Sequence, residues 1–266
     1  MPTSAALSSN ARLRDDALRR WRRGLALAAL ALTAVACSSV PPGSDRPELI
    51  RRILASTVQL RSEREGGARR AASGVVVAID PSSRRAWIVT VRHFLGPSRP
   101  QEVSVRLPGQ TKEVPAVVFA VSDEELGLDI AIVEVEIPGL TPVRLKEGMS
   151  NLGDEVLIVA FPWGQRLTVV QGIVSQIVSI PGESLVSGPA RMVDAPVSYG
   201  SSGGGVFDAR TGELIGIVET YRTAKIAIPE SDRVIEVPVP GETVLVPAPV
   251  ILQFVRDFGL ARRLPR

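Results

Sequence analysis

The sequence contains one cysteine, one histidine and few aromatic residues, and these shortages exclude several classes of protein. Cys37 has no second cysteine to pair with, so no disulfide can form within the chain. Aromatic residues make up 4% of the 266 residues, too few for the base-stacking platforms of single-stranded nucleic-acid binders. Hydrophobic residues at 45% and charged residues at 22% are ordinary globular values, which excludes a disordered chain and a disulfide-rich miniature.

The net charge of +3 is concentrated in the first segment of the chain. Residues 1–36 hold six arginines and two aspartates, which leaves 25 basic and 26 acidic residues for the remainder. A nearly neutral body lacks the basic surface that attracts a polyanion. We therefore expect no nucleic-acid partner.

Residues 1–36 have the pattern of an export signal. The positive stretch Arg19–Arg23 precedes the apolar run Gly24–Ala36, which is shorter than the ~20 residues of a membrane-spanning helix. The run ends in Ala34-Val35-Ala36-Cys37, which resembles a bacterial lipobox, in which the cysteine is lipidated and becomes the mature N-terminus. An ordinary cleavable signal with a chance cysteine, and export by a twin-arginine route, stay open as alternatives.

The lipobox resemblance implies a lipid-anchored protein of the bacterial cell envelope, on the outer membrane facing the periplasm or on the cell surface. Ser38 follows the cysteine where an aspartate would favour retention in the inner membrane. Residues 37–47 are polar and rich in proline and glycine, which predicts a flexible tether. The folded domain is then expected over residues 48–266.

From residue 48 onward, short runs rich in valine and isoleucine alternate with turn residues such as Asp80-Pro81 and Pro108-Gly109. This regular spacing of short strands is typical of β-sandwiches and β-barrels and argues against βαβ units. Apolar residues at helical spacing predict a short helix over residues 48–54 and a terminal helix over residues 249–260. The expected strands cover residues 57–60, 74–79, 86–91, 103–107, 114–121, 130–135, 155–160, 167–177, 191–193, 205–207, 214–219 and 243–246.

Three residue types that can act together in catalysis follow or precede these strands. His93 comes just after an apolar run, and as the only histidine it is the only imidazole available as a general base near neutral pH. Asp129 stands immediately before the apolar run 130–135, and Ser202 lies in the glycine-rich segment Gly200–Gly205. A serine hydroxyl becomes a nucleophile when a hydrogen-bonded base takes its proton and a carboxylate orients that base. The chain order histidine, aspartate, serine predicts such a triad.

These segments resemble the three signatures of chymotrypsin-fold (trypsin-like) serine peptidases. They read Thr90-Val91-Arg92-His93, Asp129-Ile130-Ala131 and Gly200-Ser201-Ser202-Gly203-Gly204, with spacings of 36 and 73 residues that resemble the bacterial HtrA/Deg branch. The resemblance covers roughly residues 55–258. It implies an all-β fold of two six-stranded antiparallel β-barrels, about 55–140 and about 150–248, with the active site in the cleft between them.

The resemblance implies a serine endopeptidase that acts on a protein or peptide substrate through an acyl-enzyme, with neither cofactor nor metal. The triad would be His93, Asp129 and Ser202, and the backbone amides of Gly200 and Ser202 would form the oxyanion hole. The oligomeric state stays open. The family's PDZ domain is not expected, because only six residues follow the predicted terminal helix.

The family register places Pro196 at the base of the primary substrate pocket, Tyr199 near its rim and Glu219 on its wall. With no acid at the base, we expect a small or medium aliphatic side chain before the cut bond. A carboxylate of Glu219 on the wall could instead recruit a basic side chain, or it could point outward.

Two further positions depart from the family pattern. Arg92 precedes the histidine where a small residue is usual, so its charge either lowers the basicity of the imidazole or projects into solvent. Ser201 replaces the usual asparagine or aspartate before the nucleophile. A catalytically silent, peptidase-like binding scaffold is therefore the main alternative function, and an esterase using the same groups is another.

Overall fold

The computed structural model describes residues 46–64, 67–96, 102–125, 127–178, 182, 184–227 and 234–265. The predicted export signal, Cys37 and most of the predicted tether lie outside the described residues. Among the residues that are described, no helix is both long and apolar enough to cross a membrane.

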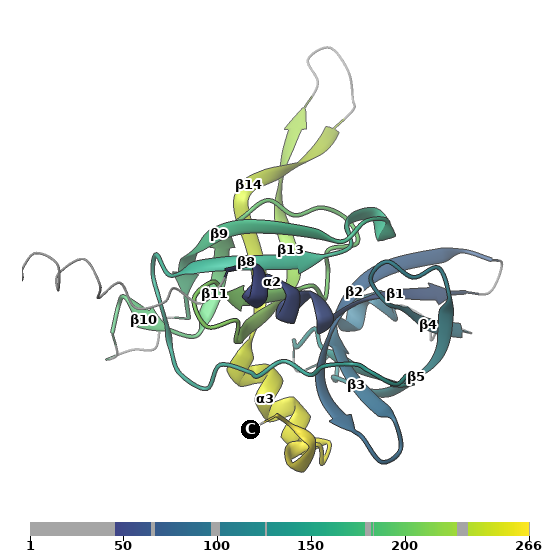
Figure 1. Cartoon of the computed structure of the whole chain (residues 1–266). Coiled ribbons are helices and arrows are strands. Elements are labelled where there is room, and N and C mark those ends of the chain that lie inside the picture. The colour runs from purple at the N-terminus through teal and green to yellow at the C-terminus, as the bar shows by residue number, and fades with distance from the viewer. Residues whose placement is uncertain are drawn as a thin grey trace, which may run out of the picture. The chain divides into compact units, whose positions relative to one another are not determined.

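The first half of the described chain closes into a barrel, which we call barrel one (Figure 1). Its strands are joined in the order β1-β2-β3-β6-β5-β4, every neighbouring pair is antiparallel, and β1 pairs with β4 to close the ring. In β4 and β5 more and less buried side chains alternate, whereas β2 and β3 are buried over most of their length. The strands are β1 (Thr57–Glu63), β2 (Arg69–Asp80), β3 (Arg85–Thr90), β4 (Glu102–Arg106), β5 (Glu113–Val121) and β6 (Ala131–Glu136).

The second half forms a second closed antiparallel barrel, barrel two, in the order β11-β14-β13-β12-β8-β9. The short strands β7 and β10 pair with each other beside it. The strands are β7 (Ser150–Asn151), β8 (Glu155–Ala160), β9 (Thr168–Ile177), β10 (Ser187–Gly188), β11 (Ala190–Asp194), β12 (Gly205–Asp208), β13 (Leu214–Ala227) and β14 (Val234–Pro247). The predicted architecture of two six-stranded antiparallel barrels is therefore confirmed.

Two strands extend well beyond the predicted ranges. β13 continues to Ala227 and β14 begins at Val234, so that their far ends form a two-stranded arm that stands out from barrel two (Figure 1). The arm lies outside the core, and its described side chains from residue 222 to residue 227 are all half-buried or exposed. A strand with no buried face has no alternating apolar pattern, which is why the sequence did not reveal this one.

The described chain begins with one of the two predicted helices and has the other near its C-terminal end. Helix α2 (Arg46–Ala55) buries Leu49 and Ile53, and the hydroxyls of Ser56 and Thr57 donate to the Ile53 carbonyl at 2.8 and 3.0 Å. These bonds satisfy a carbonyl that the end of a helix leaves without an intrahelical partner.

Helix α3 (Ala248–Asp257) follows barrel two in the chain, and its Ile251 and Val255 belong to a large buried cluster that also contains the buried side chains of barrel one. The turn η3 (Ala261–Arg263) continues onto barrel one, where the Arg263 guanidinium lies 4.9 Å from the centre of the Trp87 ring. The C-terminal segment thus ties the second half of the chain to the first.

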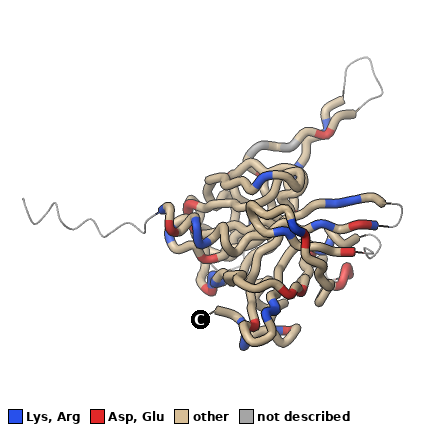
Figure 2. Tube along the Cα trace, turned by 45° about the vertical axis from the view of Figure 1, so that its right-hand side comes forward, with Lys and Arg blue, Asp and Glu red and all other residues tan. Residues whose placement is uncertain are grey.

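Charged residues of both signs are interleaved over the described surface, as Figure 2 shows. Several of them are paired across strands, for example Arg61 with Glu113 and Arg85 with Glu134.

Candidate active site

His93 lies in a short turn, and two side chains close to it in the chain are buried. It lies in the turn η1 (Arg92–Phe94) directly after β3, and the neighbouring Val91 and Phe94 are buried. Arg70, from β2, donates to the His93 carbonyl at 3.2 Å. The backbone is fixed by these contacts, while the His93 side chain itself is 49% exposed.

Asp129 precedes β6, the strand next to β3 in barrel one, and binds His93 through both carboxylate oxygens. Its Oδ2 lies 2.5 Å from Nδ1 of the imidazole, and its Oδ1 accepts the His93 backbone amide at 2.8 Å. When Nδ1 carries the proton of that bond, the lone pair of the ring is at Nε2, on the opposite side. The pairing therefore selects the tautomer in which Nε2 can accept a proton.

Burial acts to raise the pKa of Asp129, but the hydrogen bonds from His93 and the nearby charge of Arg92 outweigh it. The net result is a pKa below the ordinary value for an aspartate. The carboxylate is consequently ionised at neutral pH, the form that stabilises a protonated imidazole beside it.

The amide of Gly200 is aimed by the peptide that precedes it. The Tyr199 carbonyl accepts the Trp163 amide at 2.6 Å, and because N–H and C=O point in opposite directions in a trans peptide, this bond also fixes the Gly200 N–H. Gly200 has a φ of +87°, and a Cβ there would lie 2.8 Å from the Phe161 carbonyl oxygen. Only glycine fits this turn.

The amide of Ser202 is aimed in the same way, because the Ser201 carbonyl accepts the Gly204 amide at 2.8 Å. Among the hydrogen bonds of the described residues, neither the Gly200 nor the Ser202 amide acts as a donor to a carbonyl. Two free and oriented amides within one tight loop are the arrangement that binds a developing oxyanion.

Ser73 joins this loop to barrel one. It is fully buried in β2, its amide donates to the Ser202 carbonyl at 2.9 Å, and its hydroxyl donates to the Gly200 carbonyl at 2.9 Å. The same hydroxyl accepts the Phe161 amide at 2.8 Å, and the Ser73 carbonyl accepts the Thr90 hydroxyl at 2.8 Å. Sequence reasoning missed this residue, because a serine inside a valine-rich strand carries no local signal of such a role.

The glycine at 203 allows the serine loop to approach barrel one. Gly203 has a φ of +79°, and a Cβ there would lie 2.2 Å from the Ser73 carbonyl oxygen and 2.4 Å from the Thr90 hydroxyl. Thr90 is the last residue of β3, three positions before His93. The close approach therefore brings the loop that carries Ser202 to the end of the strand that leads to His93.

The structure thus brings the three predicted catalytic segments together, but the hydrogen bond between His93 and Ser202 is not formed. Within the described residues, His93 is hydrogen-bonded to Asp129, and no hydrogen bond joins it to Ser202. Catalytic hydrogen bonds are often long in the absence of substrate and shorten when it binds. Ser201, by contrast, is 2% exposed, and its hydroxyl accepts the Ser198 amide at 3.4 Å, which turns it away from the surface.

Arg92 forms an ion pair with Glu124, with a nitrogen–oxygen distance of 3.2 Å. The Arg92 side chain is 25% exposed, so it neither projects freely into solvent nor stands as an uncompensated charge beside His93. The expectation that Arg92 projects into solvent is therefore wrong, while the expectation that its charge acts on His93 stays a prediction.

The three predicted pocket residues do not share one cavity in the described chain. Pro196 lines an apolar cavity of about 220 Å³ together with Ser201, whereas Glu219 lines a cavity of about 560 Å³ together with Asp129. Tyr199 is 47% exposed and packs on Trp163, with ring centres 5.5 Å apart.

Glu219 is neither an outward-pointing surface residue nor an isolated charge. It forms an ion pair with Arg191 at 3.3 Å, and its side chain is 22% exposed. Burial raises the pKa of Glu219 above the ordinary value, the charge of Asp129 raises it further, and Arg191 counteracts both. The charge of Asp129 therefore acts against the ionisation of Glu219.

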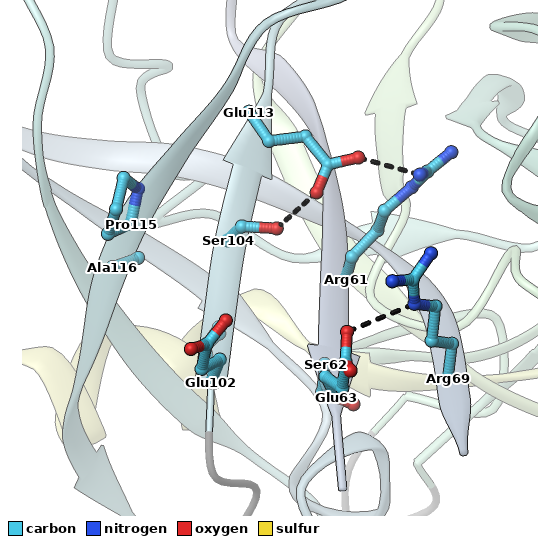
Figure 3. Close-up of a pocket in the computed structure, with 10 residues that line it drawn as sticks. Arg61, Ser62, Glu63, Arg69, Glu102, Ser104, Glu113, Pro115 and Ala116 are labelled. Atoms are coloured by element: carbon cyan, nitrogen blue, oxygen red, sulfur yellow. Dashed lines mark hydrogen bonds and ion pairs between the residues drawn. The ribbon is translucent and has the colours of Figure 1, made fainter. Parts of the chain in front are cut away.

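Another cavity, with a volume of about 660 Å³, lies on barrel one (Figure 3). Its charged groups are largely paired with each other, since Glu113 accepts from Arg61 at 2.6 Å and Glu63 accepts from Arg69 at 3.0 Å. Mutually neutralised side chains of this kind offer little to a charged ligand.

Comparison with known proteins agrees with this geometry. Residues 72–217, more than half of the chain, match the family model of the trypsin-like peptidase domain. The chain belongs to this family.

Several proteases are similar to it in sequence or structure. A peroxisomal leader peptide-processing protease of Mus musculus is 34% identical over 55% of this chain and 25% of its own length. A probable periplasmic DegP-like serine endoprotease of Buchnera aphidicola is 27% identical over 58% of this chain and 31% of its own length. The crystal structure of a serine endoprotease from Yersinia pestis superimposes with a TM-score of 0.58 at 19% identity, covering 84% of this chain and 68% of that one.

This trypsin-like domain is thus related to the HtrA/DegP serine proteases. The matched regions span about a quarter to a third of the length of these curated relatives.

Proposed function

We propose that this protein is a serine endopeptidase that cleaves peptide bonds of envelope or extracellular proteins through Ser202, His93 and Asp129. The observation that carries the proposal is the paired bonding of Asp129 to the His93 ring and amide, at 2.5 and 2.8 Å, beside a serine loop with two free amides. Together these groups supply an oriented base and two amide donors for the oxyanion, which acyl transfer requires beside its nucleophile.

The proposed reaction follows from the positions of the protons. The Ser202 hydroxyl attacks the peptide carbonyl while Nε2 of His93 takes its proton, and the ionised Asp129 stabilises the imidazolium. The Gly200 and Ser202 amides bind the negative oxygen of the tetrahedral intermediate. The imidazolium then protonates the leaving amine, which leaves an acyl group on Ser202, and water releases it by the same steps.

Cleavage of an unfolded protein substrate tests this proposal. Nucleophile and base act as a unit, so Ser202→Ala and His93→Ala should each lower kcat by ~10⁴-fold or more at unchanged fold. Ser201→Ala is the matched control, because the Ser201 hydroxyl faces the loop interior, and it should retain most of the activity. Cleavage that survives Ser202→Ala would place the nucleophile elsewhere.

For the side chain before the cut bond, we propose a small or medium aliphatic residue. No acidic residue is among the described residues that line the cavity beside Pro196, and Glu219 is already paired with Arg191. A peptide library should show cleavage after aliphatic residues. Predominant cleavage after lysine or arginine would contradict this specificity.

We also propose that the protein is exported and anchored to the bacterial cell envelope by lipid on Cys37. Support comes from the sequence alone, through the arginine-rich start, the short apolar run and the Ala34-Val35-Ala36-Cys37 ending. Mass spectrometry of membrane-extracted protein should find an acylated N-terminal cysteine. A mature chain that begins at any other residue would contradict the anchor.

A further inference from the structure

Barrel two carries exposed aliphatic side chains around the paired strands β7 and β10. Leu185 is 81% exposed, Val186 61% and Leu152 42%. The Leu152 amide donates to the Val186 carbonyl at 2.9 Å, so these residues belong to one small surface. Single exposed aliphatic residues are normal on a protein, but a group of them marks a surface that contacts something apolar.

This surface continues onto the outer face of β9. The Gly153 amide, next to Leu152, donates to the Val174 carbonyl at 2.9 Å, and the neighbouring Ile173 is 42% exposed. We call the four exposed residues Leu152, Ile173, Leu185 and Val186 the apolar patch. Figure 1 shows β10, which directly follows Val186, on the side of barrel two that lies away from barrel one.

The described chain begins beside the apolar patch. The Arg46 guanidinium donates to the side-chain oxygen of Gln171 at 2.7 Å, and Gln171 lies on β9 two residues before Ile173. Residues 171 and 173 are both exposed, so they share the outer face of the strand and lie ~7 Å apart. The polypeptide therefore enters the folded domain at the edge of the patch.

The candidate lipidation site is close to this entry point along the chain. Eight residues separate Cys37 from Arg46. Such a segment spans at most ~32 Å, whatever its conformation. A bilayer that holds a lipid on Cys37 thus stays within this distance of Arg46, and a domain tethered so closely meets the membrane at a high effective concentration.

The charges beside the patch favour an uncharged membrane surface over an anionic one. The residues opposite Ile173 in the two adjoining ladders are Glu155 on β8 and Asp194 on β11, and both are exposed. These carboxylates repel anionic headgroups, which basic clusters attract. Insertion of aliphatic side chains among zwitterionic headgroups depends instead on the apolar area that is buried.

We propose that the apolar patch docks on the bilayer that holds the lipid of Cys37, and that the lipid surface it contacts is zwitterionic. The inference rests on the proposed lipid anchor. Aliphatic side chains at a membrane interface lie ~5–10 Å deep, at the boundary between headgroups and acyl chains. The lipid and the patch are two separate attachments, which together fix the face of the domain that is turned toward the membrane.

The single cysteine of the chain allows a site-specific test. Cys37 carries the lipid in the proposed mature protein, so a cysteine introduced elsewhere is the one thiol available for a fluorescent label. The mature Leu185→Cys protein is labelled and reconstituted into vesicles of phosphatidylcholine and phosphatidylethanolamine that contain nitroxide lipid. The matched control is Val117→Cys, because Val117 is an aliphatic residue with 68% exposure on β5 of barrel one.

The label at position 185 should lose its fluorescence to the nitroxide lipid and be protected from iodide in the buffer. The label at position 117 should show the reverse. High salt should change neither result, because charge attraction does not drive this contact. Equal quenching by nitroxide at both positions, or quenching at neither in vesicle-bound protein, would overturn the proposal.

A label on a second strand examines the same surface. Leu152→Cys should also be quenched by the nitroxide lipid. The quenching should be lost when Leu185→Ser and Val186→Ser are added, since these changes remove apolar area that the interface would bury. Undiminished quenching in the variant with all three changes would contradict insertion of the patch.

Two further results separate this inference from its premise and from a different occupant. Mass spectrometry that finds no lipid on Cys37 would contradict the anchor and this inference together, whereas a lipidated chain without quenching at position 185 would contradict this inference alone. Energy transfer between donor- and acceptor-labelled copies, in place of quenching by nitroxide lipid, would overturn it in favour of contact with a second copy of this chain.

Discussion

Replacement of Ser73 by alanine should damage both the stability and the activity of this protein. The Ser73 hydroxyl is the hydrogen-bond partner of the Phe161 amide and the Gly200 carbonyl in a fully buried position. A buried polar group that loses its partner costs ~1–3 kcal/mol, so the loss of both bonds should lower the free energy of unfolding by about 2–5 kcal/mol. Urea unfolding of the wild type and of Ser73→Ala measures this difference.

The effect on activity has a separate cause. The Ser73 hydroxyl also holds the Phe161 amide, close to Trp163, whose own amide fixes the peptide that contains the Gly200 N–H. The loss of both bonds loosens this segment together with the serine loop, so the Gly200 amide is held less firmly toward the oxyanion, and kcat should fall about 10- to 100-fold with little change in KM. Ser104→Ala is the matched control, because the Ser104 hydroxyl bonds to Glu113 at the surface and its loss should change stability by less than ~0.5 kcal/mol. If Ser73→Ala unfolds and turns over like the control, the role given to this residue is wrong.

Three further predictions concern packing, charge and covalent structure. Gly203→Ala should cost about 3 kcal/mol or more by chemical unfolding because its Cβ meets Ser73, whereas Gly153→Ala, also at positive φ but in open space, should cost only about 1 kcal/mol. Burial acts to raise the pKa of Asp208, but its ion pair with Lys146 at 2.8 Å and two loop amides hold it below the ordinary value. Its contribution is therefore present above the unfolded pKa of ~3.9 and lost as the pH falls below it, so Lys146→Met should cost about 3–5 kcal/mol at neutral pH and clearly less near pH 3. Reducing agent should leave the melting temperature unmoved, since a single cysteine permits no internal disulfide.

The strand pattern could be predicted from the sequence wherever one face of a strand is buried. The strands that include Val75, Ile88, Ile132 and Ile158 could be recognised, because each has fully buried side chains. The arm could not be predicted, since its stability comes from cross-strand pairing and not from a buried face. Two-residue strands such as β7 and β10 are too short to leave any periodicity.

The candidate site likewise has features that could be predicted from the sequence and features that could not. The pairing of His93 with Asp129 could be expected, because the residue types and their order are characteristic of one chemistry. The contribution of Ser73 could not, because it depends on contacts with residues 88 and 127 positions away in the chain. The Arg191–Glu219 ion pair could not be predicted either. An ion pair between strands depends on the register of those strands, which the sequence does not state.

The most direct test of the proposed catalysis is covalent labelling with a fluorophosphonate probe, which reacts only with a serine activated by its neighbours. Four forms of the full-length protein are compared, namely the wild type, Ser201→Ala, Ser202→Ala and His93→Ala. Labelling of the first two and of neither of the others is the result expected if Ser202 is the nucleophile and His93 its base. Labelling of Ser202→Ala, or a well-folded wild type that takes no label and cleaves no unfolded protein, would contradict it, and the second result would favour a silent binding scaffold.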